Sequence, residues 1–230
     1  MNRSYAKTER SFGPKSGLVL LSGGLDSAVN LAAAVACGMR VSALTVDYGQ
    51  RAAEREVESA VRLAGRYDIR HDVIRLNWFP DLCPSKLTGR GRELPLLKEG
   101  DLDRRDVTLE SARAVWVPNR NGLLMNIAGA LAESRELEAV IVGFNAEEGA
   151  TFPDNTEACI EAMNELFKWT TASSVSVHSF TTQMTKREIA RLGADLKVPF
   201  DLIWSCYEGG KSRCEQCESC LRFARALKSL

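Results

Sequence analysis

The sequence predicts an α/β protein in which a Rossmann-like parallel sheet carries helices on both of its faces. Five runs have the length and composition of short buried strands, at residues 18–21, 41–46, 71–76, 139–143 and 175–179. Helical patterns follow these runs, at residues 28–37, 52–67, 123–135, 156–169 and 186–196. Strands that alternate with helices at this spacing form right-handed βαβ units, so we expect the strands to run parallel.

Length and composition limit the possible classes. The 230 residues suffice for one domain with a substantial core and leave little room for a second. Lysine plus arginine equals aspartate plus glutamate, at 30 each, which gives no overall attraction to nucleic acid or to a membrane. Residues 1–15 lack the apolar run of a signal peptide, so we expect a disordered arm before a single domain over residues 16–230. No run reaches the roughly 18 apolar residues of a membrane span. We therefore expect a cytoplasmic protein.

The first strand leads into the SGGLDS loop, residues 22–27, and then into a stretch of small residues. A buried strand, a glycine turn and a helix start together let backbone N–H groups face an anion. Gly23 and Gly24 allow positive φ and close approach of a phosphate, while Ser22 and Ser27 add hydroxyl donors. Asp26 adds a carboxylate for Mg²⁺ beside the phosphates. The alternative interpretation is an ordinary tight turn.

Residues 77–115 lose clear periodicity and contain several prolines and glycines among many charges. A segment of this length without clear structure is typical of a functional loop. We interpret it as a cover over the active site, and a merely mobile excursion is the alternative.

Later loops carry further polar residues toward the same sheet edge. Asn121 is the expected N-cap of the helix over residues 123–135, with Arg120 at the helix mouth, where an anion would lie. Thr185 is the expected cap of the helix that begins at Lys186. Because loops after neighbouring parallel strands share one edge, we expect the SGGLDS loop, the Tyr48 turn, Arg120 and Asp154 to line one crevice.

Four cysteines near the C-terminus have the spacing C-x₇-C-x₂-C-x₂-C, at Cys206, Cys214, Cys217 and Cys220. Four thiolates suit tetrahedral zinc, and a closed shell of four ligands is typical of a structural site. The sequence therefore predicts one zinc ion per chain in a segment over residues 204–222. An iron–sulfur cluster, which also takes four thiolates, is the alternative.

The SGGLDS loop resembles the SGGxDS loop of the ATP-pyrophosphatase (PP-loop) superfamily, whose members cleave ATP between the α- and β-phosphates. Further motifs extend the resemblance to the 7-cyano-7-deazaguanine synthases, the QueC family. They are LSGGLDS at 21–27, DYGQR at 47–51, VPNRN at 117–121, FPD at 152–154, EAMNE at 161–165, MTKREI at 184–189 and WSCYEGG at 204–210. Their order and spacing cover most of residues 17–227.

The resemblance implies an adenine nucleotide alpha hydrolase-like fold and a carbon–nitrogen ligase that uses ATP, Mg²⁺ and Zn²⁺. Its substrates would be 7-carboxy-7-deazaguanine and ammonia, and its product would lie on the path to queuosine or archaeosine. The chain contains no glutaminase-sized segment, so free ammonia is the expected nitrogen source. The expected partners are small molecules and a second copy of the chain in a homodimer, with no nucleic acid bound directly.

Residue roles follow from the same resemblance. ATP would be bound by Leu21, Ser22, Gly23, Gly24, Leu25, Asp26 and Ser27. Asp26, Arg120 and Lys186 would be catalytic, with Lys186 adding positive charge at the phosphates. Arg120, Phe152 and Asp154 would bind the substrate: Phe152 by stacking on its ring and Asp154 by accepting from its N–H groups. The alternatives are a solvated Lys186 and a helix-entry turn at residues 152–154.

The chain departs from the family at the expected base pocket. The usual stretch is close to SGYPDCR, whereas residues 150–156 read ATFPDNT. A related enzyme that adenylates a different carboxylate, or joins a deazaguanine to another acceptor, is therefore an alternative. An enzyme acting directly on tRNA would be expected to carry a basic RNA-binding domain, which the neutral balance and short chain disfavour. A non-enzymatic nucleotide-binding module is the remaining alternative.

Overall fold

The computed structural model describes residues 13–89 and 93–230, so the first twelve residues of the expected disordered arm lie outside the described residues. Its five strands form one sheet in the order β3-β2-β1-β4-β5. Each neighbouring pair of strands is parallel. The strands are β1 (Ser16–Leu20), β2 (Arg40–Asp47), β3 (His71–Arg75), β4 (Ala139–Ile141) and β5 (Ser176–His178). The predicted parallel α/β sheet is confirmed.

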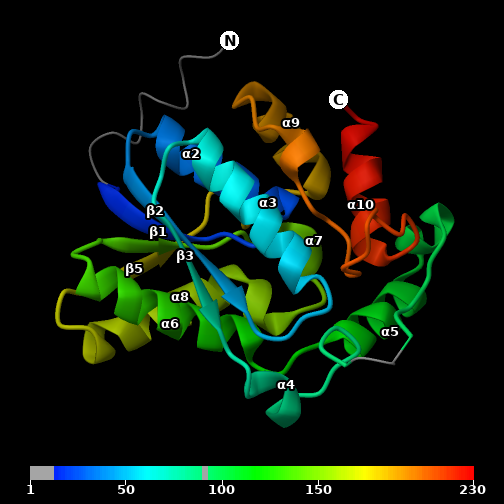
Figure 1. Ribbon diagram of the computed structural model, residues 1–230, viewed down its shortest axis with the longest axis horizontal. Coiled ribbons are helices and arrows are strands. Elements are labelled where there is room, and N and C mark those ends of the chain that lie inside the picture. The colour runs from blue at the N-terminus through cyan, green and yellow to red at the C-terminus, as the bar shows by residue number, and fades with distance from the viewer. Residues whose placement is uncertain (1–12, 90–92) are drawn as a thin grey trace.

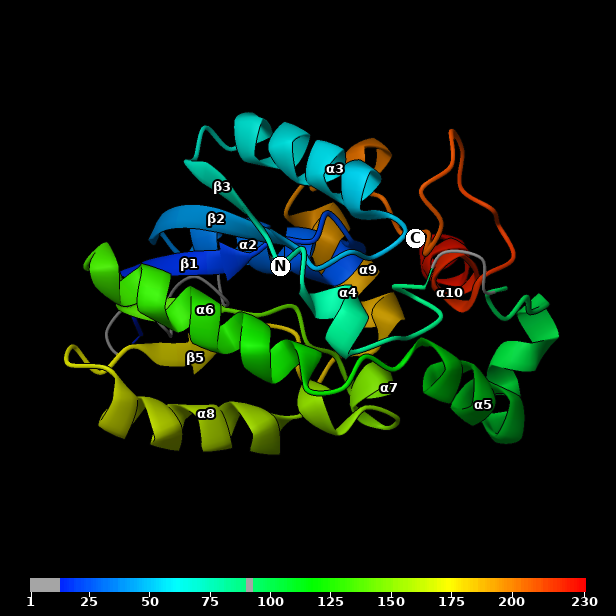
Figure 2. The same cartoon turned by 60° about the horizontal axis from the view of Figure 1, so that its bottom comes forward.

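Helices cover both faces of this sheet (Figure 1). One face carries α2 (Leu25–Ala36), α3 (Ala53–Arg66) and α9 (Lys186–Asp195), and the other carries α6 (Arg120–Ser134) and α8 (Glu157–Thr170). Figure 2 shows the remaining helices beyond the end toward which β1 points. They are α4 (Phe79–Leu82), α5 (Arg105–Val115), α7 (Ala146–Gly149) and α10 (Glu218–Leu227). Over the part of the chain described, these helices are too short or too polar to cross a bilayer.

The two-residue period of the strands builds two apolar cores. Leu18 of β1 packs with Met125 and Phe167 on the α6 and α8 side of the sheet. Its neighbour Val19 packs with Val29 and other residues of α2, α3 and α9 on the opposite side. Adjacent side chains of a strand point to opposite faces, and both faces of this sheet are covered. The central strands therefore carry apolar residues on both faces rather than in strict alternation with exposed polar ones.

Two local features differ from the sequence-based expectations. Residues 105–115, expected to be irregular, form α5, whose buried face includes Thr108, Ser111 and Ala112. Small and polar residues on the buried face hide the apolar stripe by which a helix is recognised. The N-cap of α6 is Asn119 in a left-handed conformation, and Asn121 lies inside the first turn, so that expectation was wrong. Thr185 caps α9 as expected, in a capping box with Glu188.

The sheet places a crevice between β1 and β4. The chain passes from β1 to β2 and β3 on one side, then returns to β4 on the other side of β1. Ligands of open α/β sheets bind at such a switch point, outside the carboxyl ends of the strands. Gly143 follows β4 there, and a Cβ atom added to it would lie 2.7 Å from the backbone nitrogen of Ser27. Glycine at 143 therefore lets the end of β4 pack directly on the start of α2.

We predict that Gly143→Ala lowers the free energy of unfolding by about 1–3 kcal/mol, the usual cost of extra atoms at a packed site. Urea unfolding followed by circular dichroism measures this change. Gly65→Ala is the matched control, because an added Cβ in α3 meets nothing within 4 Å. That variant should be more stable by about 0.5–1 kcal/mol, as helix propensity dictates. Equal unfolding midpoints for Gly143→Ala and the unmodified chain would contradict the close approach.

Candidate active site

The SGGLDS loop joins β1 to α2 and is held from two other segments. Gly23 has a φ of +78°, and a Cβ there would lie 2.6 Å from the Ser59 hydroxyl. The Gly23 carbonyl accepts from that hydroxyl at 3.0 Å and from the backbone N–H of Trp204, also at 3.0 Å. The loop is thus fixed by α3 and by the segment that precedes the cysteines.

The N-terminus of α2 has the features of an anion site. Its N-cap is Gly24, and no side chain caps it in the described part of the chain. The Ser22 and Ser27 hydroxyls lie 3.2 Å apart, and both line the cavity at the switch point. Uncapped N–H groups at a helix start, with the positive end of the helix dipole, favour a bound anion.

Lys186, the first residue of α9, lies beside this loop. Its ammonium forms ion pairs with Asp26 Oδ2 and, at 2.7 Å, with Glu148 Oε1. The side chains of Lys186 and Asp26 are only 13% and 14% exposed, so the alternative of a solvated lysine was wrong. Asp26 Oδ1 is buried and has no hydrogen-bond partner among the described residues. One carboxylate oxygen is therefore paired, while the other is available to a bound group.

The charges of this cluster depend on one another. Burial raises the pKa of the Asp26 carboxyl to about 6, against the opposing effect of Lys186. Burial alone would lower the pKa of Lys186, but Asp26 and Glu148 raise it above its ordinary value, so the ammonium keeps its proton. Burial would likewise raise the pKa of Glu148, and the Lys186 charge brings it below its usual range. The lysine thus holds a carboxylate on either side.

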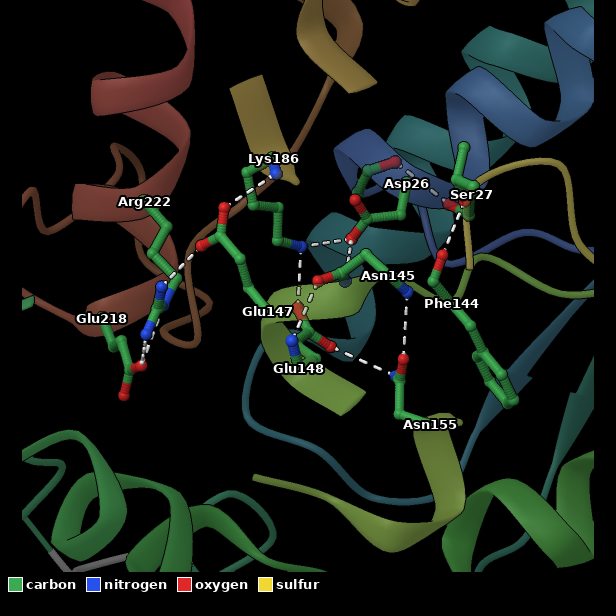
Figure 3. A network of polar contacts seen from close by, with 12 residues as sticks. Asp26, Ser27, Phe144, Asn145, Glu147, Glu148, Asn155, Lys186, Glu218 and Arg222 are labelled. Carbon is green, nitrogen blue, oxygen red and sulfur yellow. Dashed lines mark hydrogen bonds and ion pairs between the residues drawn. The ribbon is translucent and has the colours of Figure 1, made fainter. Parts of the chain in front are cut away.

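A chain of polar contacts continues from Lys186 to α10 (Figure 3). The backbone N–H of Lys186 donates to Glu147 Oε1 at 2.8 Å. The other oxygen of Glu147 accepts from Arg222 at 2.7 Å, and Arg222 also contacts Glu218 Oε1 at 2.8 Å. The first residues of α9 are therefore tied through α7 to the helix that follows Cys217.

Arg120 and Asp154 line the cavity from the α6 side. The Arg120 guanidinium donates to the Tyr48 hydroxyl at 3.1 Å. Asp154 Oδ2 accepts from the backbone N–H of Asn121 at 3.2 Å, within the first turn of α6. Burial raises the pKa of Asp154, while the Arg120 charge opposes the rise. Asp154 is not the cap of the helix that follows it, since Thr156 caps α8 by accepting from Cys159 N–H at 3.2 Å.

Phe152 stands between Asp154 and an aromatic support. Its ring stacks on Trp116, with centroids 5.8 Å apart and planes inclined by 11°. Stacked aromatic pairs hold one ring in a defined orientation. The structure thereby gives Phe152 a fixed place in the cavity wall.

One cavity brings nearly all the predicted site residues together. It is lined by Leu21, Ser22, Gly24, Leu25, Asp26, Ser27, Arg120, Phe152, Asp154 and Lys186. Gly23 does not line it and serves the conformation of the loop instead. The Tyr48 turn also reaches this cavity, and so does Leu87 from the segment interpreted as a cover.

Sequence reasoning gave no role to several other lining residues, namely Glu56, Trp204, Tyr207, Glu218 and Arg222. Glu56 lies on the polar side of the expected helix pattern, where a carboxylate is ordinarily solvated. In the structure its carboxylate accepts from Gln50 Nε2 at 2.7 Å, and burial raises its pKa. For Trp204 and Tyr207 the sequence did offer a signal. They flank Cys206, an expected metal ligand, so they had to lie near the cysteine cluster.

Asn155 and Thr156, which differ from the usual sequence of the family, both form hydrogen bonds with other residues of the chain. Asn155 accepts from the backbone N–H of Asn145 at 3.1 Å and donates to Glu148 Oε2 at 3.3 Å. Thr156 is the cap of α8. Both residues support the cavity wall, and Asn155 also lines the cavity, together with Phe152 and Asp154 of the same stretch.

The four predicted cysteines converge beside this cavity. Their Sγ atoms all lie within 4.8 Å of one another, and Cys206, Cys217 and Cys220 are buried. Cys206 Sγ accepts backbone N–H groups from Glu208 and Cys214, each at 3.3 Å. Four thiolates can surround a metal ion such as zinc in a tetrahedral arrangement, and N–H donors to the sulfur atoms fix the orientation of the thiolates. The donor set therefore fits a bound metal ion.

Known proteins similar to this chain identify its family. The family described as queuosine biosynthesis protein QueC matches residues 16–230. A 7-cyano-7-deazaguanine synthase from Pelotomaculum thermopropionicum is 48% identical over 212 residues, which cover 92% of this chain and 96% of the relative. A protein of the same name from Bdellovibrio bacteriovorus is 45% identical over 216 residues, with 94% of each chain covered.

Among solved structures, the NMN synthetase from Francisella tularensis resembles this fold with a TM-score of 0.50. The two are 18% identical, and the match covers 92% of this chain and 75% of that chain. At this identity the likeness concerns the fold alone. The resemblance inferred from the sequence motifs is confirmed by the sequence relatives: the chain belongs to the QueC family.

Proposed function

We propose that this chain is an ATP-dependent ligase that converts 7-carboxy-7-deazaguanine and ammonia to 7-cyano-7-deazaguanine, for queuosine or archaeosine formation. One observation carries the proposal. A single cavity is lined by an anion-binding helix start with Lys186 and by an aromatic and carboxylate wall at Phe152 and Asp154. This arrangement suits a phosphate group and a planar heterocycle with N–H donors in one site. The names of the relatives support the same activity.

The chemistry requires the carboxylate to be activated, because ammonia does not displace oxide from it. The acid oxygen attacks the α-phosphorus of ATP, which gives an acyl-adenylate and releases pyrophosphate. Ammonia then adds to the acyl carbon, AMP leaves, and the amide forms. A second ATP adenylates the amide oxygen with loss of pyrophosphate. The adenylated amide gives up one nitrogen proton to become a neutral imidate, and loss of AMP together with the second nitrogen proton then gives the nitrile. Two ATP molecules are thus consumed for each nitrile.

The protein contributes position and charge to these steps. Backbone N–H groups of the SGGLDS loop, with the Ser22 and Ser27 hydroxyls, would bind the phosphates that leave as pyrophosphate. The Lys186 ammonium, which keeps its proton, would stabilise charge that develops on the leaving group. The unpaired Asp26 Oδ1 fits a ligand of Mg²⁺, which would neutralise phosphate charge when bound. No covalent nucleophile is needed.

The opposite wall would hold the deazaguanine acid. Phe152, supported by Trp116, would stack on the bicyclic ring. Asp154 would accept the N–H groups of the 2-aminopyrimidinone edge, and Arg120 would bind the carboxylate or its adenylate. The homodimer and the absence of a direct nucleic-acid partner stay predictions.

Product analysis tests this function. We predict that the chain with ATP, ammonium and 7-carboxy-7-deazaguanine yields the nitrile, AMP and pyrophosphate, identified by mass spectrometry and chromatography. Asp26→Asn keeps the shape of the side chain and removes its charge, so pyrophosphate release should fall by at least about a hundredfold, as for loss of a charge-stabilising group. A wild-type rate in Asp26→Asn would contradict the role of the loop. An unchanged acid would show that the chain acts on another substrate.

The cysteine cluster should bind one zinc ion per chain, in a closed site that stabilises the fold. We predict that Cys217→Ser lowers both the zinc content and the temperature of unfolding, because Cys217 is fully buried among the other three thiols. Elemental analysis and differential scanning calorimetry measure the two effects. Cys159→Ser, outside the cluster, is the control and should keep one zinc. Iron with sulfide in the isolated protein would contradict the zinc assignment.

Asp154 is expected to recognise the edge of the deazaguanine ring. Asp154→Asn should weaken binding of the acid by at least about tenfold, since one acceptor becomes a donor. The affinity for ATP should change little, and isothermal titration calorimetry measures both. Because Asp154 also accepts from Asn121 N–H, the free energy of unfolding is measured in parallel. Reduced stability with unchanged affinity for the acid would show that Asp154 only holds the start of α6.

A further inference from the structure

We propose that Arg222 is a positioning residue that holds Lys186 against the SGGLDS loop through Glu147. This inference rests on the proposed function, in which Lys186 meets the phosphates of ATP. It assigns a task to an arginine on α10, the helix that contains Cys220, outside the sheet and its loops.

Arg222 is held between two carboxylates on different elements. It contacts Glu218 Oε1 one turn earlier on α10 at 2.8 Å, and Glu147 Oε2 on α7 at 2.7 Å. The Arg222 side chain is only 18% exposed, and that of Glu218 is 11% exposed. A planar guanidinium that bridges two carboxylates has little freedom to turn, unlike a lysine at the same place. The orientation of Glu147 is therefore fixed from α10.

Glu147 passes this constraint on to Lys186. One of its oxygens accepts from Arg222, and the other accepts from the backbone N–H of Lys186 at 2.8 Å. Lys186 is the first residue of α9, where the N–H groups point out of the helix and a carboxylate is favoured. Figure 3 shows Arg222 and Asp26 on opposite sides of Lys186, joined to it by these contacts. The backbone of Lys186 is thus held from one side and its ammonium from the other.

Charge balance gives Arg222 a second part in the same task. The network of Figure 3 contains the carboxylates of Asp26, Glu147, Glu148 and Glu218. Its cations are Lys186 and Arg222. Without Arg222, the Glu147 carboxylate would have the Lys186 ammonium as the remaining cation of the network. It would compete with Asp26 and Glu148 for that ammonium and draw it away from the loop.

The cysteine cluster sets the place of Arg222. Cys217 immediately precedes α10, and Cys220 lies inside its first turns. The segment before Cys206 is bonded to the loop itself, through Trp204 N–H and the Gly23 carbonyl. The cysteine segment is thus joined to the loop directly and, through Arg222 and Glu147, to Lys186.

Kinetics of matched variants test the proposal. Arg222→Met should raise the KM for ATP by at least about tenfold, within the range over which residues of one network couple. The affinity for the deazaguanine acid and the zinc content should stay unchanged. Arg225→Met is the control on the same helix: Arg225 lies near the network, but its guanidinium contacts Asp103 and the Glu99 carbonyl and makes no hydrogen bond or ion pair with Glu147 among the described residues. Glu147→Gln breaks the ion pair with Arg222 without leaving an unpaired carboxylate, so it tests the positional link from α7 alone. It should raise the KM in the same direction, and it keeps the test open if Arg222→Met folds poorly.

A double-mutant cycle separates positioning from direct contact with ATP. If Arg222 acts through Lys186, then adding Arg222→Met to a Lys186→Met chain should cause no further loss of pyrophosphate release. A further tenfold loss in the double variant would overturn the proposal, as would an unchanged KM in both Arg222→Met and Glu147→Gln.

A measurement on Lys186 itself is independent of the reaction. Acylation of Lys186 by an N-hydroxysuccinimide ester, followed by peptide mass spectrometry, should be slow in the unmodified chain because the ammonium is buried and paired. It should be at least about threefold faster in Arg222→Met and Glu147→Gln, and unchanged in Arg225→Met. Equal rates in all four proteins would overturn the positioning role. The acylation experiment tests the positioning role even if no nitrile or pyrophosphate forms. Absence of those products would instead contradict the proposed function.

Discussion

The pairing of the buried Lys186 ammonium with the carboxylates of Asp26 and Glu148 is the interaction on which the candidate site depends. It joins the first turn of α2, which carries Asp26, to α7 and α9, which come from distant parts of the chain. Such a cluster is costly to bury and is stable only when its geometry is fixed by further bonds. Asn145, which caps α7 and contacts Asp26 at 3.4 Å, supplies one of them. These polar contacts therefore act together with the apolar packing of α2 in holding the loop beside α7 and α9.

The parts of the fold that follow from local rules could be predicted from the sequence. Buried parallel strands are continuous apolar runs, and a glycine turn before a helix indicates an anion site. Thr185 was recognised as a cap because a hydroxyl three residues before Glu188 is a local signal. Helix α5 was missed because Thr108 and Ser111 face the interior, so its buried side is not apolar. Patterns read along the chain describe each helix, whereas burial depends on its neighbours.

The site shows the same division. Residues within named motifs, such as Asp26, Arg120 and Asp154, were correctly expected to meet at one sheet edge, because topology alone brings those loops together. Arg222 was not singled out, since its contacts with Glu147 join residues 75 positions apart and leave no periodic signal. Residues 153–155 do form a turn before α8, but the Asp154 carboxylate bonds to the first turn of α6, a contact that the local sequence did not indicate. Contacts between side chains that are far apart in the sequence could not be predicted from local patterns.

The bond between Trp204 and Gly23 has a consequence for synthesis on the ribosome. Domains form as the chain emerges, with N-terminal segments available first. The strand and helix that flank the loop emerge early, whereas Trp204 and the cysteines emerge about 180 residues later. A nascent chain therefore has its loop sequence long before the loop has its partners. The contacts that hold the SGGLDS loop are therefore complete only after Trp204 has emerged.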